Sequence, residues 1–244
     1  MQIRSSARSD VGRGRAHNED FFIVAGEQGC FAVADGMGGH GNGDIASRLA
    51  TETIQDVFGG QSKRGSRLAD RLRRSIEEAN RRVYEAASHN ADLSGMGATA
   101  VAMAFAEGKG FLGSVGDSRA YLLRGGGLRQ LTDDHTWVRE QISAGRLSEA
   151  QARKHPFRSV VTRALGGDET IEVDMRELDP RAGDLYLLCS DGLNAVLSDD
   201  EIRDRLEPDQ SLSTLCSRLI DAANARGGPD NITVVLVAIE DSVD

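Results

Sequence analysis

The chain has 244 residues, of which 39% are hydrophobic and 27% are charged, and its formal net charge is −9. This length and composition fit one soluble globular domain with an ordinary core. The acidic balance argues against a nucleic-acid-binding protein, because such a protein needs a basic surface to neutralise phosphates.

No segment predicts a membrane span or an export signal. The apolar runs fall well short of the roughly 20 residues that cross a bilayer, and the polar stretch 1–10 lacks the apolar centre of a signal peptide. The three cysteines, Cys30, Cys189 and Cys216, stand in apolar surroundings and predict buried thiols in a reducing compartment. We therefore expect a cytoplasmic protein without membrane contact.

The amino-terminal half begins with a predicted strand pair, followed by a helix pair. Two short apolar runs, 21–25 and 30–34, flank Gly26–Gly29 and predict a hairpin. Apolar residues at helical spacing then predict helices over 44–58 and 67–88. A polar, glycine-rich loop is expected between them at 59–66.

The rest of the chain returns to paired strands. The predicted elements follow in this order: strands 97–105, 110–115 and 120–124, a turn at 125–127, helices 137–144 and 148–154, strands 171–178 and 184–189, helices 200–206 and 212–226, and a strand over 231–239. Strands that come in pairs argue against a doubly wound parallel sheet. We expect an α+β fold with antiparallel sheets and helices packed outside them.

Acidic residues stand at the ends of five of these strands. They are Glu19-Asp20 before the first strand, Asp35-Gly36 after the second, Asp117 after 110–115, Asp191-Gly192 after 184–189, and Asp230 before the last. A carboxylate beside a buried strand is costly unless its charge is compensated. A turn is the simpler explanation of any single Asp-Gly pair, but five such strand ends in one chain favour a shared counter-charge.

The residue types favour hard divalent cations as that counter-charge. Carboxylates and carbonyls are preferred ligands of Mg²⁺ and Mn²⁺, and no pairing of cysteines and histidines has zinc spacing. Two such ions about 4 Å apart would activate a water for attack on phosphorus. Ion pairs are the alternative, but the local sequence offers few cations other than Arg15 and Arg119.

Eight short motifs resemble, in order, those of the bacterial metal-dependent PPM (PP2C-type) Ser/Thr protein phosphatases. They are Ser9-Asp10-Val11-Gly12 with Arg15 and Asn18-Glu19-Asp20; Val33-Ala34-Asp35-Gly36-Met37-Gly38-Gly39-His40; Met96-Gly97-Ala98-Thr99; Gly116-Asp117-Ser118-Arg119; Leu131-Thr132-Asp133-Asp134-His135; Val161-Thr162-Arg163-Ala164-Leu165-Gly166; Cys189-Ser190-Asp191-Gly192-Leu193; and Asp230-Asn231-Ile232-Thr233. Each motif is weak alone, but the ordered set covers nearly the whole chain and is highly specific.

The resemblance implies a four-layer α-β-β-α sandwich, in which two central antiparallel β-sheets are flanked by helices. It implies one catalytic domain over 1–244, with a flap segment over about 133–165 that lies beside the metal site and helps to select substrates. In the flap, His135 and His155 are expected to be polar surface residues and Trp137 a packing anchor.

The resemblance also implies a centre of two Mn²⁺ or Mg²⁺ ions and a third ion site. Asp35 would bridge the two ions, and the carbonyl of Gly36 would bind one of them. Asp191 and Asp230 would bind the other ion, and Asp117 would join Asp191 at the third site. A water activated by the ion pair would attack the phosphorus of phosphoserine or phosphothreonine in line.

Other residues would support that centre. Glu19 is expected to hold a water of the ion pair, and Asp20 to support the same shell. Arg15, with Asp35 a predicted catalytic residue, would grip the substrate phosphate, a task that suits a planar guanidinium. Animal relatives carry a His after the Asp-Gly pair as the proposed general acid, and here that position is Met37. The proton donor to the leaving group is therefore unassigned, and His40, although close in sequence, is not given the role.

We expect a protein serine/threonine phosphatase that reverses a Ser/Thr protein kinase and acts as a monomer. An inactive regulatory module of the same fold is one alternative. Such a module would be expected to have lost some of the metal-binding acidic residues, and all of them are present here. A phosphoesterase of nucleotides or other small molecules is another, because two-metal chemistry does not itself select a protein substrate. The glycine-rich stretch 36–43 lacks the Gly-Lys-Ser/Thr ending of a nucleotide-binding P-loop.

Overall fold

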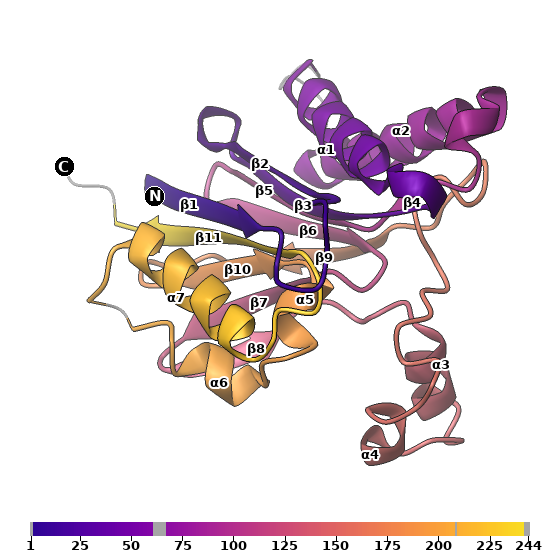
Figure 1. The fold of residues 1–244 in the computed structure, drawn as a ribbon. Coiled ribbons are helices and arrows are strands. Elements are labelled where there is room, and N and C mark those ends of the chain that lie inside the picture. Colours follow the sequence, from indigo (N-terminus) through magenta and orange to yellow (C-terminus); the bar gives the residue numbers. More distant parts are fainter. Residues whose placement is uncertain (1, 61–66, 208, 242–244) are drawn as a thin grey trace.

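The computed structural model describes residues 2–60, 67–207 and 209–241. Two antiparallel sheets stack face to face, with helices on the outer face of each (Figure 1). The strand order of the five-stranded sheet is β1 (Gln2–Asp10), β11 (Ile232–Glu240), β10 (Leu185–Cys189), β7 (Arg119–Arg124) and β8 (Gly127–Gln130). The order of the six-stranded sheet is β2 (Asp20–Ala25), β3 (Cys30–Met37), β5 (Ala100–Ala106), β6 (Lys109–Val115) and β9 (Asp174–Leu178), with β4 (Gly97–Ala98) paired to β3. The predicted four-layer α+β sandwich is confirmed.

The helices divide into two covering groups and a projecting arm. The six-stranded sheet is covered by α1 (Gly43–Gly60) and α2 (Leu68–His89). The five-stranded sheet is covered by α5 (Asp191–Asn194), α6 (Asp199–Arg203) and α7 (Leu212–Ala225). The arm consists of α3 (Trp137–Ser143) and α4 (Glu149–Ala152), which project away from the sandwich (Figure 1).

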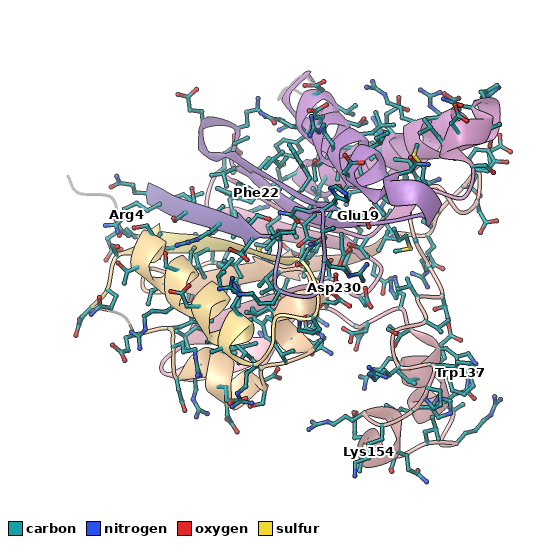
Figure 2. All side chains as sticks on the ribbon, viewed as in Figure 1. Arg4, Glu19, Phe22, Trp137, Lys154 and Asp230 are labelled. Atoms are coloured by element: carbon teal, nitrogen blue, oxygen red, sulfur yellow. The ribbon has the colours of Figure 1, made fainter. Side chains whose placement is uncertain are left out.

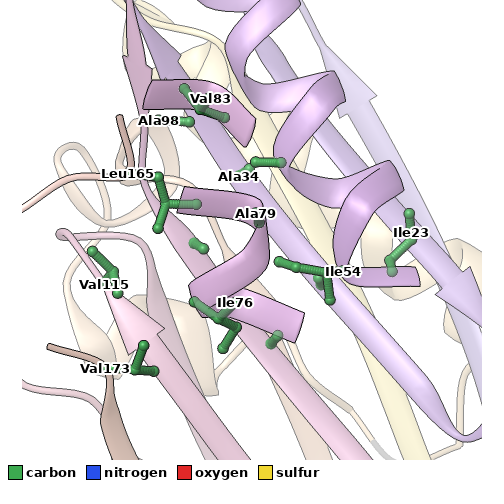
Figure 3. Packing of buried hydrophobic residues seen from close by; sticks show 14 of the residues in the cluster. Ile23, Ala34, Ile54, Ile76, Ala79, Val83, Ala98, Val115, Leu165 and Val173 are labelled. Atoms are coloured by element: carbon green, nitrogen blue, oxygen red, sulfur yellow. The ribbon is translucent and has the colours of Figure 1, made fainter. Parts of the chain in front are cut away.

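Three apolar clusters hold the four layers together. One lies between the α1–α2 pair and the six-stranded sheet and includes Ile54 and Ile76 (Figure 3). A second lies under α7, and the third fills the space between the two sheets. Successive side chains of a strand point to opposite faces of the sheet, so one strand contributes to two clusters. In β3, Ala32 faces the helices, while Phe31 and Val33 face the other sheet. This packing fixes the relative position of the sheet ends that carry the acidic residues.

The structure differs from the sequence-based elements at a few strands. The sequence does not predict β1, because it is an edge strand whose only apolar contacts to the core are the half-buried Ile3 and Ala7. The predicted turn 125–127 runs into the unpredicted strand β8. The predicted strand 97–105 breaks at Thr99, whose N–H leaves the ladder to donate to the carbonyl oxygen of Asp35 at 2.8 Å.

Smaller expectations also have outcomes. Helix α1 continues through Gly60, so the start of the predicted loop 59–66 is helical, and 61–66 lie outside the described residues. The three cysteines are free and buried, as predicted. In the described part of the chain, no helix combines the length and apolarity that crossing a membrane requires.

Candidate active site

The acidic residues of the strand ends come together at one end of the two sheets. Asp20 and Asp35 are direct cross-strand partners in β2 and β3. Asp191 is the first residue of α5 after β10, and Asp230 comes just before β11 in the same sheet. Burial raises the pKa of Asp35 well above its ordinary value, and repulsion from Asp20, Asp191, Asp117 and Asp230 adds to this. Both sheets therefore contribute carboxylates to one electrostatically coupled cluster.

These carboxylates lack the counter-charge that their burial requires. The Oδ1 atoms of Asp20 and Asp191 are buried without a hydrogen-bond partner. Burial, reinforced by neighbouring carboxylates, raises the pKa of Asp20 to about 7 and that of Asp117 to about 7. Arg15 supplies one positive charge, through a 2.7 Å contact from Nη2 to Oδ2 of Asp230. A set of oxygen donors with surplus negative charge fits hard divalent cations.

Within the described ranges, no three acidic, histidine or cysteine side chains close around a single point. Asp35, Asp191 and Asp230 are each partly exposed, so solvent reaches these carboxylates. Mg²⁺ usually keeps several waters and takes only one or two protein carboxylates. Partly exposed carboxylates are compatible with such a hydrated ion.

Two glycines allow the backbone to approach closely at this site. A Cβ on Gly36 would lie 1.9 Å from the carbonyl oxygen of Gly43, at the start of α1. A Cβ on Gly192 would lie 2.0 Å from the carbonyl oxygen of Asn231. No side chain fits at either position, which explains why glycine follows the aspartate at both strand ends. Figure 2 shows Glu19 and Asp230 at the same edge of the sandwich.

Asn231 ties the Arg15 loop to the cluster, a role that sequence reasoning did not assign. Its Nδ2 donates to the carbonyl oxygens of Val11 and His17, both at 2.9 Å. Its Oδ1 accepts from the backbone N–H of Glu19 at 2.8 Å. The side chain thus holds both ends of the loop that presents Arg15.

Hydroxyl groups hold the carboxylate of Asp20 and the backbone of Asp35. Ser190 donates from Oγ to Oδ2 of Asp20 at 2.7 Å and accepts from the backbone N–H of Thr233 at 3.0 Å. Thr99 accepts at Oγ1 from the backbone N–H of Asp35 at 2.9 Å. The sequence motifs that carry the acidic residues also contain Ser190, Thr233 and Thr99. Their position next to the acids in sequence could have indicated this supporting role.

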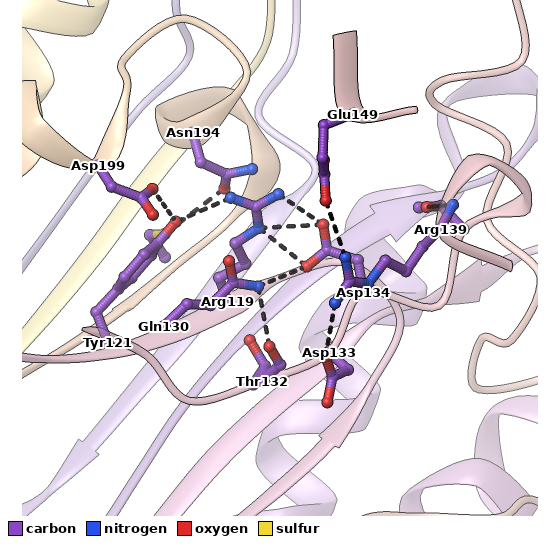
Figure 4. A network of polar contacts seen from close by, with 12 residues as sticks. Arg119, Tyr121, Gln130, Thr132, Asp133, Asp134, Arg139, Glu149, Asn194 and Asp199 are labelled. Atoms are coloured by element: carbon purple, nitrogen blue, oxygen red, sulfur yellow. Dashed lines mark hydrogen bonds and ion pairs between the residues drawn. The ribbon is translucent and has the colours of Figure 1, made fainter. Parts of the chain in front are cut away.

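Arg119 does not neutralise the cluster, although it follows Asp117 closely in sequence. Its guanidinium forks onto Asp134 with contacts of 2.6 to 3.1 Å (Figure 4). Its Nη1 also donates to the hydroxyl of Tyr121 at 3.0 Å, and Gln130 donates to the same Asp134 carboxylate at 3.0 Å. In the part of the chain that the structure describes, direct ion pairing with the cluster is therefore limited to the Arg15 contact, and Arg119 lowers the pKa of Asp117 and Asp191 only through its more distant charge.

His135 is buried, and the expectation of a polar surface residue was wrong. The N–H of Gly116 donates to its Nδ1 at 3.0 Å, so the ring hydrogen is on Nε2, which donates to Asp174 at 3.1 Å. The backbone N–H of His135 also donates to the carbonyl oxygen of Gly116 at 3.0 Å. Asp174 is further held by Arg163 at 2.7 Å. His135 thus joins the base of the arm to the turn that carries Asp117.

Exchanging His135 for alanine is expected to lower the free energy of unfolding by about 2 kcal/mol, because the buried N–H of Gly116 loses its acceptor. Urea denaturation measures this loss. The control is His155→Ala, which removes a partly exposed imidazole from the arm and is expected to cost less than about 1 kcal/mol. Equal losses in the two variants would contradict the structural role of His135.

Trp137 anchors the arm by local packing, consistent with the expectation from sequence. Its ring stacks on His155 with centroids 4.7 Å apart and meets Phe157 edge-on at 5.4 Å. Phe157 is nevertheless 53% exposed, and Val160 is 44% exposed. The arm therefore presents apolar groups to solvent on the side of the molecule where the acidic cluster lies (Figure 2).

A cleft of about 390 Å³ lies between the end of α2, strand β4 and the segment 164–167. Met37, two residues beyond Asp35, lies on its wall with Met96, Leu165 and Gly166. The segment around Leu165 is fixed there by hydrogen bonds with Ala98 on β4. The cleft thus borders the segment that leads out of the arm, and Met37 is its link in sequence to Asp35.

Comparison with known proteins finds relatives over nearly the whole chain. The sequence profile described as "Protein phosphatase 2C" matches residues 11–236. The serine/threonine phosphatase stp of Listeria welshimeri is 40% identical over 240 residues, covering 96% of this chain and 95% of that protein. The serine/threonine protein phosphatase PstP of Mycobacterium tuberculosis is 40% identical over 241 residues, covering 99% of this chain and 46% of that protein.

Solved structures show the same fold. The crystal structure of the M. tuberculosis phosphatase PstP/Ppp superposes with a TM-score of 0.92 at 39% identity, covering 99% of this chain and 100% of that one. A structure of the PstP catalytic domain in complex with two manganese ions has a TM-score of 0.86 at 38% identity, covering 98% of this chain and 99% of that one.

Proposed function

The chain belongs to the protein phosphatase 2C family, and we propose that its acidic cluster hydrolyses phosphoserine and phosphothreonine in proteins. One observation carries the proposal. The fold places four carboxylates near one another and raises the pKa of each, those of Asp20, Asp35, Asp117 and Asp191. The positive charges of the protein therefore do not compensate the negative charge of the site. The names of the relatives as serine/threonine phosphatases support this substrate class.

The enzyme is metal-dependent, and we propose Mn²⁺ or Mg²⁺ as the ions. Asp35 would serve both ions, one together with the carbonyl of Gly36 and the other together with Asp191 and Asp230, and Asp117 would join Asp191 at a third site. The two manganese ions in the related PstP structure support this assignment. When bound, such ions lower the pKa of water and supply hydroxide near neutral pH.

The protein's own residues position this chemistry. Glu19 would hold a water of the ion pair, and Asp20, held by Ser190, would support the same shell. Arg15 is half exposed and pairs with Asp230, so it serves as that carboxylate's counter-ion. A cation at Asp230 would release Arg15, which could then form two parallel hydrogen bonds to the substrate phosphate.

Met37 carries no acidic proton, and it stands where a proton donor would be in animal relatives. Met37 instead lines the cleft between α2, β4 and the segment 164–167. We propose that this cleft takes a side chain next to the phosphorylated residue, and that water protonates the leaving alkoxide. The apolar lining supports a protein substrate over a nucleotide.

Exchanging Arg15 for alanine is expected to raise KM for a phosphothreonine peptide about 10- to 100-fold, the range that loss of charge-assisted hydrogen bonds allows. Steady-state kinetics at saturating Mn²⁺ measures the effect. Arg13→Ala is the matched control, because it removes the same charge from the same exposed loop. A normal KM in the Arg15 variant would remove its assigned role.

We further propose one catalytic domain over 1–244 with a flap over about 133–165, acting as a monomer in the cytoplasm against a Ser/Thr protein kinase. The free thiols are compatible with a reducing compartment. The arm of α3 and α4, joined to the Asp117 turn through His135, supports the flap assignment.

A substrate panel tests the function. The Mn²⁺-loaded protein is assayed on a phosphothreonine peptide, on p-nitrophenyl phosphate and on ATP. A protein phosphatase is expected to show the highest kcat/KM on the peptide. Preference for ATP would favour a small-molecule phosphoesterase, and inactivity on all three would favour a regulatory module.

A further inference from the structure

A second pocket lies at the open lateral edge of the sandwich. It has a volume of about 380 Å³ and is lined by residues of β7, β8 and β9. Strands β8 and β9 are the terminal strands of their respective sheets, so the pocket opens where neither sheet continues. Leu122, Leu131, Leu178 and Tyr186 are buried and line its apolar interior.

This pocket is distinct from the acidic cluster. Strand β7 begins at Arg119, close to Asp117, and reaches the pocket only at Leu122 and Arg124. At about 3.4 Å per residue, Leu122 lies roughly 10 Å and Arg124 roughly 17 Å along the strand from Arg119, and no residue of the acidic cluster lines the pocket. A ligand in the pocket would therefore not contact the acidic cluster.

Two arginines from different sheets point into the gap between the sheets. On β8, Arg129 is the cross-strand partner of Leu122. On β9, Arg176 is the cross-strand partner of Leu112. Direct partners share a face of the sheet, and both leucines belong to the cluster between the sheets. The two guanidiniums thus approach one pocket from its two sides.

Neither of these guanidiniums is compensated. Among the described residues, the side chains of Arg129 and Arg176 have no hydrogen bond or ion pair. The third arginine of the pocket, Arg124, is different, because it forks onto Asp184 at 2.6 and 2.7 Å. Two uncompensated positive charges therefore face one pocket in a protein whose net charge is −9.

The acidic residues of the wall do not neutralise them. Glu177 pairs with Phe111, which packs toward the helices, so its side chain faces away from the space between the sheets. Asp179 is engaged by Arg181 at 2.6 Å. The positive charge at the mouth of the pocket is thus available to a ligand.

We propose that this pocket binds a phosphate-type oxyanion, free or carried by a protein. Guanidiniums match phosphate oxygens with paired, charge-assisted hydrogen bonds, and Arg129 and Arg176 are exposed at the mouth of the pocket, where an anion can reach both. Inward-pointing charges on edge strands also discourage sheet-to-sheet pairing. That structural role does not require arginines from both sheets to converge on a single pocket.

The test is an amide NMR titration of the metal-free protein in EDTA at constant ionic strength. Without cations, the acidic cluster repels anions, so binding there is suppressed. Inorganic pyrophosphate and a phosphothreonine peptide are added separately to the wild type, to Arg129→Gln/Arg176→Gln, and to Arg73→Gln/Arg74→Gln. The last variant removes two exposed arginines of α2 and is the charge-matched control.

Both probes, or one of them, are expected to shift the amides of 122–129 and 176–179 saturably in the wild type and the control. The affinity of the Arg129/Arg176 variant should be at least about tenfold weaker. Response to pyrophosphate indicates a free anion, and response to the peptide alone indicates a protein-borne phosphate. If the double variant does not fold, the two single variants replace it, each with a smaller loss. Equal affinity in all folded variants, or no shift of these amides by either probe, overturns the proposal.

Discussion

Exchanging Asp191 for asparagine is expected to abolish turnover of a phosphothreonine peptide and to stabilise the metal-free protein. The side chain has a buried Oδ1 without a hydrogen-bond partner, and burial together with repulsion from Asp230 raises its pKa. An amide keeps the shape and removes the negative charge. The activity should fall at least about a thousandfold, the order that loss of one transition-state electrostatic contact costs. The metal-free stability should rise by about 1–2 kcal/mol.

These opposite effects distinguish a functional carboxylate from a structural one. Turnover is measured at saturating Mn²⁺, and stability by urea denaturation in EDTA. The matched control is Asp221→Asn, on the exposed face of α7, which is expected to change neither quantity. A variant of Asp191 that lost activity and stability together would show that the carboxylate supports the fold.

The metal-free protein is expected to become less stable as the pH rises from 5 to 8. The pKa of Asp20 and that of Asp117 are each raised to about 7, chiefly by burial. In the unfolded chain both groups titrate near pH 4, so between these values the folded state binds more protons than the unfolded state. The free energy of unfolding then falls with rising pH. Each pKa unit corresponds to about 1.4 kcal/mol, and we expect a total loss of at least about 2 kcal/mol.

The pH range is chosen to isolate the acidic cluster. Carboxylates with lowered pKa, such as Glu78 at about 2, lose their stabilising contribution only at more acidic pH. Saturating Mn²⁺ should remove the dependence between pH 5 and 8, because a cation replaces the protons as counter-charge. Denaturation series at several pH values, with EDTA and with Mn²⁺, provide the comparison. Stability of the metal-free protein that rises over this range would contradict the clustered, uncompensated carboxylates.

Local patterns predicted the acidic residues but not their meeting point. Asp35 and Asp191 each follow a buried strand directly, and this is visible in the sequence. The two residues lie close together only because the two sheets stack, which brings the end of β3 beside the start of α5. No local periodicity contains that information, and the ordered family motifs supplied it instead.

Two features that escaped prediction, strand β1 and the buried His135, depend on tertiary contacts. Strand β1 is polar over most of its length, yet all of its residues pair with β11. His135 looks like a loop histidine in sequence, but its two ring nitrogens have partners on β9 and at Gly116. The pairing partner in each case is distant in sequence, so composition and spacing could not indicate it.

Titrating the metal-free protein with Mn²⁺, while turnover of a phosphothreonine peptide is followed, tests the central claim most directly. The claim is that the carboxylates at the sheet ends act by holding divalent cations. It predicts no turnover in EDTA, saturable recovery with Mn²⁺ in the wild type and in Asp221→Asn, and no recovery in Asp191→Asn. Turnover that survives thorough chelation would contradict it.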